Sequence, residues 1–168
     1  YDPDKAFAPI SIAGAQDYML LTHPAFAAAS VKELVALAKA KPGAISFSHT
    51  GAGTGTHLAG ELFKSAAGVD LMAVPYKNIT AAVIAVMSNE VPISFTSIYT
   101  ALPQVRAGKV KAVAVAGEKR SPALPDTPTV AEAGLPGYAS GNWYGFLAAA
   151  GTPRDRKSTR LNSSHVSE

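Results

Sequence analysis

The residue types most suited to binding chemistry are concentrated between residues 48 and 57. Glycines and threonines dominate there, in the order Thr50-Gly51-Ala52-Gly53-Thr54-Gly55-Thr56. Glycine adopts positive φ without strain and lets a bound group approach the backbone closely. A short strand is predicted before this run and a helix from about Thr56, which would place the free N–H groups of the first helical turn beside the loop. The pattern predicts a cradle for a small anion.

Nucleotide binding is the main rival use of such a loop. A dinucleotide site requires the spacing G-x-G-x-x-G and an acidic residue near the end of the next strand. Thr56 stands where the third glycine belongs, and the next predicted strand ends at Tyr76-Lys77 without an acid. The Gly-Lys-Ser/Thr phosphate loop and the G-x-S-x-G elbow are absent as well. A nucleotide- or dinucleotide-binding α/β enzyme domain that uses Gly51–Gly55 is kept as the alternative function.

Histidines beside the loop raise the question of a metal site. His57 and Glu61 are four residues apart on the predicted helix, and His49 precedes the loop. The H-E-x-x-H spacing of a catalytic zinc site is missing. We expect His57 to hydrogen-bond the loop and Glu61 to pair with Lys64 on the helix surface. No set of nucleophile, base and orienting group is visible, so neither an enzyme nor a metal or cofactor is expected.

Further ligand candidates follow the other predicted strands. Parallel strands end at one edge of a sheet, and ligands bind at that edge. The residues at these ends are Tyr76-Lys77, Thr96-Ser97 and Gly117-Glu118. Lys77 is either simply solvated or complements a carboxylate as a point charge. These groups suit a small polar anion held by hydrogen bonds.

Composition narrows the class of protein. The 168 residues are 48% hydrophobic and 16% charged, which suits one globular domain, or one with part of another. Cysteine is absent, which excludes disulfides and thiolate metal sites, and no apolar run is long enough to span a membrane. The first residues lack the order of a signal peptide. The net charge is +3, and residues 154–168, with four basic and two acidic residues, contribute +2 of this charge. The rest of the chain therefore carries a net charge of only +1, so no nucleic-acid face is expected.

Strand and helix patterns alternate along the chain. Strands are predicted at 18–22, 45–48, 71–76, 91–96, 110–116 and 143–148. Helices are predicted at 30–41, 56–68, 80–89, 98–107 and 129–133, and residues 1–15 are expected to be irregular. This alternation predicts an α/β fold, with a mostly parallel sheet and helices on both faces.

Three packing expectations accompany these elements. Ser30 and Glu33 form a predicted capping box at the start of the first helix. Leu58, Leu62 and Ala66 are expected to face the core from the helix after the glycine loop. Trp143 and Tyr144, on the last predicted strand, are expected to be core residues because aromatic side chains dominate core area.

Several longer motifs resemble one known family. They are Ser30-Val-Lys-Glu-Leu34, the run from Gly51 to Phe63, Val74-Pro-Tyr-Lys77, the run from Lys119 to Gly137, and Trp143-Tyr-Gly-Phe146. Together they resemble the substrate-binding receptors of tripartite tricarboxylate transporters, the Bug family. The resemblance covers about residues 1–153, and its most specific part is the run from Lys119 to Gly137.

The resemblance implies a periplasmic-binding-protein type II fold, the two-lobed Venus flytrap, and no enzyme activity. It implies a periplasmic, monomeric receptor that captures a small carboxylate, a di- or tricarboxylate or similar, and delivers it to membrane permease subunits. Thr96 and Ser97 match a segment where relatives carry an acidic or amide residue, and so depart from the pattern. The expected ligand-binding residues are Thr50, Gly51, Gly53, Thr54, Thr56, His57, Tyr76, Lys77, Thr96 and Ser97.

The resemblance also implies a domain organisation. Residues 1–23 would end a first lobe and cross to the second, residues 24–138 would form the second lobe, and residues 139–153 would cross back. We expect a fragment, with the signal peptide and most of the first lobe preceding Tyr1. Residues 154–168 depart from the family pattern and hold few apolar groups, so a disordered or foreign tail is expected.

Overall fold

The computed structural model describes residues 2–153 and residue 156. The chain divides into two compact units, residues 1–15 with 143–168 and residues 16–142. The lobe boundaries expected from the sequence stay predictions. The expected tail at 154–168 lies outside the described residues, apart from Arg156.

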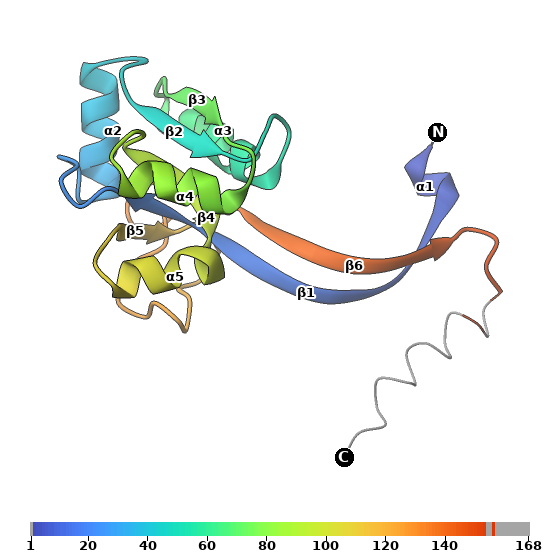
Figure 1. Ribbon diagram of the computed structural model, residues 1–168. Coiled ribbons are helices and arrows are strands. Elements are labelled where there is room, and N and C mark those ends of the chain that lie inside the picture. The colour runs from blue at the N-terminus through green and yellow to red at the C-terminus, as the bar shows by residue number, and fades with distance from the viewer. Residues whose placement is uncertain (1, 154–155, 157–168) are drawn as a thin grey trace. The chain divides into compact units, whose positions relative to one another are not determined.

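The smaller unit differs from the sequence-based expectation. Residues predicted to be irregular form a short helix, α1 (Pro3–Ala6), and the first part of a long strand, β1 (Phe7–Thr22). β1 pairs with β6 (Gly141–Ala149), beside which it runs in Figure 1. The prediction was wrong because a strand from the far end of the chain supplies backbone partners that local sequence does not reveal.

The aromatic residues of β6 are not core residues. Trp143 is 64% exposed and Tyr144 is 53% exposed. Their expected burial is therefore wrong. The reason is that these residues lie in the smaller unit, where the described elements are only β1, β6 and the short α1, so the ribbon has no second layer to bury them.

The larger unit is built on an open sheet with strand order β3-β2-β4-β1-β5. β2 (Ser46–His49) runs parallel to both of its neighbours, β3 (Met72–Pro75) and β4 (Ile93–Ser97). β1 runs antiparallel to β4 and also to β5 (Lys111–Val115). The predicted α/β class is confirmed, and β1 is the strand whose direction opposes the others.

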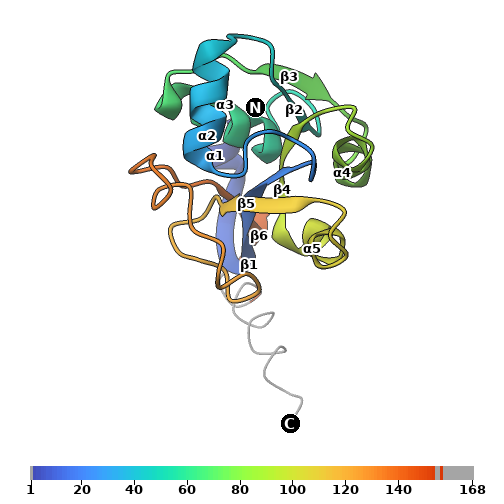
Figure 2. The same ribbon diagram turned by 90° about the vertical axis from the view of Figure 1, so that its left-hand side faces the viewer.

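Helices cover both faces of this sheet, as predicted (Figure 2). One face carries α2 (Val31–Ala40) and α3 (Gly55–Ala67), and the other carries α4 (Ile79–Met87) and α5 (Ile98–Arg106). None of the helices in the described residues has the length and apolar character that a membrane crossing needs.

Two hydrophobic cores result, one on each face. Alternate residues of β1 feed them, with Leu20 on the side of α2 and α3 and with Met19 and Leu21 on the side of α4 and α5. The first core also contains Phe47 and Phe63, both fully buried. Because both faces are covered, the central strands are also buried at polar positions, and the hydroxyls of Ser48 and Ser94 donate to the backbone carbonyls of Ala82 and Ser48.

The first residues of α2 confirm the predicted capping box. The Ser30 hydroxyl accepts a hydrogen bond from the Glu33 N–H at 3.2 Å. The Glu33 carboxylate accepts one from the Ala29 N–H at 2.7 Å. The two bonds fix the residue at which the helix begins.

The helix predicted at 129–133 is a turn. Thr129 and Glu132 exchange side-chain-to-backbone hydrogen bonds, as at a helix start. Pro128 precedes the turn and Gly134 ends it at φ 125°, which leaves room for a single turn only.

α3 packs on a different face from the one predicted. Leu58 and Leu62 are 56% and 42% exposed, and Ala66 is exposed too. The buried stripe consists of smaller residues around Phe63, including Gly60. A side chain at Gly60 would overlap the Phe47 ring, so the helix approaches the sheet with its narrowest face.

Candidate functional site

The glycine loop joins the end of β2 to the start of α3, as predicted. Gly51 and Gly53 have φ values of 122° and 77°, which L-residues rarely adopt. Thr54 is the N-cap residue, but its hydroxyl does not cap the helix and instead donates to the Gly51 carbonyl at 2.7 Å. The backbone N–H groups of residues 55–57 therefore find no acceptor within the described part of the chain. An uncapped helix start of this kind can bind an anion.

The threonine hydroxyls of the loop bond to one another. Thr56 Oγ1 lies 2.9 Å from Thr50 Oγ1 and 3.2 Å from Thr54 Oγ1, and it accepts the Thr50 N–H at 3.1 Å. Thr56 is only 4% exposed. The structure thus brings the predicted residues Thr50, Thr54 and Thr56 together as a network that holds the loop, and their role as ligand donors stays a prediction.

Two histidines support the loop from one side. Gly51 N–H donates to His49 Nδ1 at 3.1 Å, and Gly53 N–H donates to His57 Nδ1 at 3.3 Å. The two rings lie 4.5 Å apart between centroids. Because each Nδ1 accepts a hydrogen bond, each neutral ring carries its proton on Nε2. Burial lowers the pKa of His49, which favours this neutral form.

The predicted surroundings of His57 are confirmed. His57 bonds the loop, and the Glu61 carboxylate pairs with Lys64 at 3.1 Å. Within residues 2–153, no three His, Cys, Asp or Glu side chains converge in a way that could hold a metal ion.

Tyr76 and Lys77 lie beside the loop, but their side chains do not join its network. The Tyr76 N–H donates to the His49 carbonyl at 2.8 Å, which ties β3 to the start of the loop. The Tyr76 hydroxyl donates to the Glu90 carboxylate at 2.8 Å. Burial, with a smaller contribution from Glu90, raises the pKa of Tyr76 to about 12. Lys77 is exposed.

Thr96 and Ser97 end β4, one strand away from the loop. Thr96 is fully buried, and its hydroxyl has no hydrogen-bond partner among the described residues. The Ser97 hydroxyl donates to the Gln16 side-chain oxygen at 2.5 Å. Neither hydroxyl bonds to the threonine network of the loop.

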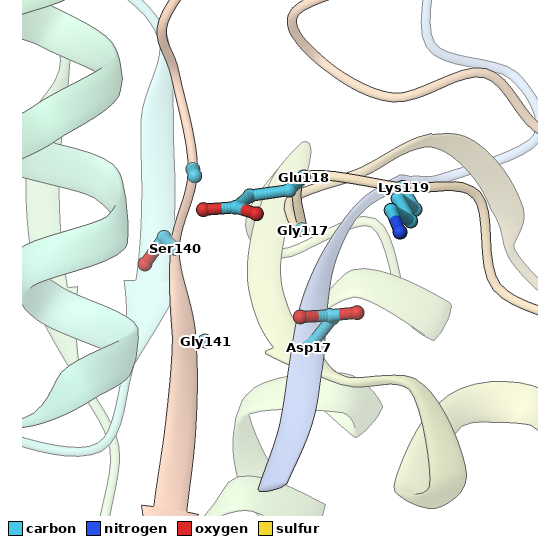
Figure 3. A pocket seen from close by; sticks show the side chains of 7 residues that line it. Asp17, Gly117, Glu118, Lys119, Ser140 and Gly141 are labelled. Atoms are coloured by element: carbon cyan, nitrogen blue, oxygen red, sulfur yellow. The ribbon is translucent and has the colours of Figure 1, made fainter.

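A cleft at the same edge of the sheet was missed by sequence reasoning. It has a volume of about 500 Å³ and is lined by Asp17, Gly117, Glu118, Lys119, Ala139, Ser140 and Gly141. Figure 3 shows Asp17 on β1, the segment 117–119 after β5, and Ser140 and Gly141 beside them. Burial, and to a lesser extent the charge of Glu118, raises the pKa of Asp17.

The sequence held only part of the signal for this cleft. Gly117-Glu118 was placed at the ligand edge as a strand end. Asp17 was not, because it precedes the apolar run of its strand instead of following it. Since β1 runs against its neighbours, its first buried residues lie at the edge where the other strands end.

Comparison with known proteins gives a family. The family model described as "Tripartite tricarboxylate transporter family receptor" matches residues 1–165. A UPF0065 protein in the tcbD-tcbE intergenic region of Pseudomonas sp. (strain P51) is 34% identical over 155 residues, which is 92% of this chain and 46% of that protein. Protein BugT of Bordetella pertussis is 31% identical over 160 residues, 95% of this chain and 48% of BugT. The chain therefore spans about half the length of these relatives.

Solved structures agree with this assignment. R. palustris Rpa4515 with adipate superposes with a TM-score of 0.86 at 32% identity, over 98% of this chain and 55% of that one. MatC from Rhodopseudomonas palustris with bound malate gives 0.85 at 32% identity, over 98% and 55%. The periplasmic binding protein BugD gives 0.84 at 32% identity, over 97% and 55%. The family and these neighbours are solute-binding proteins and not enzymes. The resemblance noted in the sequence is confirmed, and the chain belongs to the tripartite tricarboxylate transporter receptor family.

Proposed function

We propose that this chain forms the second lobe and crossing strands of a periplasmic, monomeric receptor. The receptor binds a small carboxylate, a di- or tricarboxylate or similar acid, and passes it to the permease subunits of a tripartite tricarboxylate-type transporter. The observation that carries the proposal is the uncapped start of α3 behind the glycine loop. Support comes from two structural neighbours that contain the carboxylates adipate and malate.

The loop suits a carboxylate because its other polar groups are already satisfied. The hydroxyls and the two imidazole Nδ1 atoms bond within the loop, and the backbone N–H groups of residues 55–57 remain as donors for a ligand. A hydrogen bond to a charged group contributes about 1.5–3 kcal/mol, and the helix dipole adds about 0.3–1 kcal/mol. Two such bonds and the dipole together contribute about 3–7 kcal/mol without any cationic side chain, compared with the about 8 kcal/mol of micromolar affinity.

Calorimetric titration of the two-lobed receptor tests this proposal. Succinate, malate, adipate and citrate serve as ligands, and NAD and ATP serve as the alternative anions. We expect saturable binding of at least one carboxylate with no turnover. Binding of NAD or ATP while every carboxylate is inert would overturn the proposal in favour of a nucleotide site.

A further inference from the structure

The first turn of α3 lacks the cap that its own sequence offers. Thr54 stands at the N-cap position with the extended backbone of a capping residue, φ −72° and ψ 158°. A threonine there ordinarily accepts a hydrogen bond from the N–H of the second or third helical residue. The Thr54 hydroxyl instead donates to the Gly51 carbonyl at 2.7 Å and accepts from the Thr50 hydroxyl at 3.2 Å. The shape of the loop, and not its residue types, therefore leaves the first turn uncapped.

A tight turn draws the Thr54 hydroxyl away from the helix. The Thr54 N–H donates to the Gly51 carbonyl at 3.3 Å, which closes a turn over residues 51–54. The same carbonyl accepts the proton of the Thr54 hydroxyl. The direction of this hydroxyl thus depends on where the turn places Gly51. Any group that fixes the turn also keeps Thr54 from capping α3.

Two imidazoles fix the turn at its glycines. His49 Nδ1 accepts the Gly51 N–H at 3.1 Å, and His57 Nδ1 accepts the Gly53 N–H at 3.3 Å. Gly51 and Gly53 both have positive φ, and they lie between β2 and α3, outside the backbone bonding of either element. Side chains therefore take the place of backbone acceptors for these two N–H groups.

The two rings are themselves held by the core. His49 ends β2 and is only 3% exposed, and His57 lies in the first turn of α3. Their ring centroids are 4.5 Å apart, and they lie 5.7 and 6.4 Å from the centroid of the fully buried Phe47 ring. One ring precedes the turn in sequence and the other follows it. The turn is thus fastened to the core on both sides.

We propose that His49 and His57 are positioning residues that keep the start of α3 uncapped for the ligand. Their Nδ1 atoms hold the turn in the shape that directs the Thr54 hydroxyl to Gly51 and away from the helix. When one of these bonds is lost, the turn relaxes, Thr54 caps α3, and a carboxylate must displace that cap before it binds. The histidines act on the ligand through Thr54. This inference rests on the carboxylate function proposed above.

Variants of the two-lobed receptor, titrated with succinate, malate, adipate and citrate, test the inference. An Asn side-chain oxygen can take the place of Nδ1, whereas a Gln oxygen reaches only the place of Nε2. We expect His57→Gln to bind about fivefold more weakly, the competition from one N-cap bond, and His57→Asn to stay within about twofold of wild type. The same two substitutions at His49 should give the same order. His23→Gln removes a similar bond outside the loop, from the Ala25 N–H to His23 Nδ1 at 3.1 Å, and should leave the affinity unchanged.

Removal of the competing hydroxyl should restore binding. Thr54→Val cannot cap the helix, so the double variant of His57→Gln with Thr54→Val should bind more tightly than His57→Gln alone. Amide hydrogen exchange of the ligand-free receptor gives a direct readout. The amide of residue 57 should exchange more slowly in His57→Gln than in wild type, because Thr54 then accepts its hydrogen, and quickly again in the double variant.

The outcomes separate this inference from the proposed function. If His57→Asn loses as much affinity as His57→Gln, or if the added Thr54→Val weakens binding further, the histidines are merely structural supports and the inference is overturned, although the receptor function stands. A slowly exchanging residue-57 amide in the ligand-free wild type would overturn it too, and that measurement needs no variant to fold. If no carboxylate binds the wild type, the proposed function falls, and the exchange comparison still decides whether the histidines keep α3 uncapped.

Discussion

The glycine loop and the Asp17 cleft lie at the same edge of one sheet, but they treat their polar groups in opposite ways. In the loop, three hydroxyls and two imidazoles bond to neighbours within a few residues of sequence. In the cleft, a partly buried carboxylate is held against two glycines and receives no hydrogen bond from the described residues. The side chains of the loop are already hydrogen-bonded before a ligand arrives, whereas the Asp17 carboxylate is not.

The contrast has a different consequence for each region. A loop whose side chains are already bonded loses little conformational entropy when a ligand binds, so its backbone N–H groups can bind any carboxylate. A carboxylate left without a partner instead carries the cost of its partial burial, which is why the pKa of Asp17 is raised.

Gly53→Val should produce the largest effect. A β-branched residue strongly resists the φ of 77°, so the loop must change shape. We expect carboxylate affinity, measured by calorimetry, to fall at least about 100-fold, the loss of two hydrogen bonds to a charged group.

Gly108→Val is the matched control. Gly108 has a similar φ of 67°, also in open space, but lies beyond the end of α5. The Gly108→Val variant should lose about as much stability as Gly53→Val does, but it should keep its affinity for the carboxylate. Equal affinity in the two variants would mean that the loop is not the carboxylate site.

Thr56→Val should destabilise the loop network. The substitution keeps the shape but leaves the Thr50 N–H without its acceptor. An unsatisfied buried donor costs about 1–3 kcal/mol, so the free energy of unfolding in urea should fall by that amount. Thr80→Val, at an exposed position of α4, should change it by less than about 0.5 kcal/mol. A loss no larger than this for Thr56→Val would contradict the description of the loop as internally bonded.

Acidification should weaken the loop. Protonation of His49 places a proton on Nδ1, where the Gly51 N–H now donates. Because burial lowers the pKa of His49 below its usual 6.5, the unfolded chain binds this proton first. The contribution of neutral His49 to the stability of the fold is therefore fully present above about pH 6.5 and is lost as the pH falls through the lowered pKa. We expect a loss of about 1 kcal/mol, one hydrogen bond, from urea unfolding at a series of pH values.

Two histidine variants locate this effect. His57 and Glu61 also face His49, the first opposing and the second favouring its protonation. His49→Gln should flatten the profile, whereas His23→Gln, outside the loop, should leave it unchanged. An unchanged profile in His49→Gln would place the acid sensitivity elsewhere.

The cleft should respond to pH with the opposite sign and the smallest effect. The pKa of Asp17 is raised above its usual 3.8, so its contribution is complete below that value and is lost as the pH rises through the raised pKa. Asp17→Asn removes this cost, and we expect a gain of roughly 0.5 kcal/mol near neutral pH. Thermal unfolding should show the gain shrinking towards pH 3.8. A gain that persists undiminished there would exclude the ionised carboxylate as its source.

Local sequence patterns predicted the features that depend on neighbours in the chain. The capping box at Ser30, the positive φ values at Gly51 and Gly53, and the bond from the loop to His57 are all local. Each needs only a few adjacent residues of the right type. Patterns of this range are readable without knowledge of the rest of the fold.

Features that depend on distant pairing were not predictable in this way. The face on which α3 packs was decided by the fit of Gly60 against Phe47, not by its leucines. The strand at residues 7–15 exists because β6 pairs with it. Asp17 reached the cleft only because β1 opposes its neighbours. In each case the deciding partner lies far away in sequence.

The position of β1 has a consequence for how the protein folds. β1 precedes the other strands of the larger unit in sequence, and its neighbours there, β4 and β5, follow only after β2 and β3. The fully buried run Met19–Leu21 therefore has no partners in β4 and β5 until the chain has been synthesised as far as these two strands. Long-range pairing of this kind slows folding and exposes apolar strands to aggregation. Assembly of the sheet should thus be limited by the synthesis of β4 and β5. A chaperone that covers β1 until then should reduce aggregation.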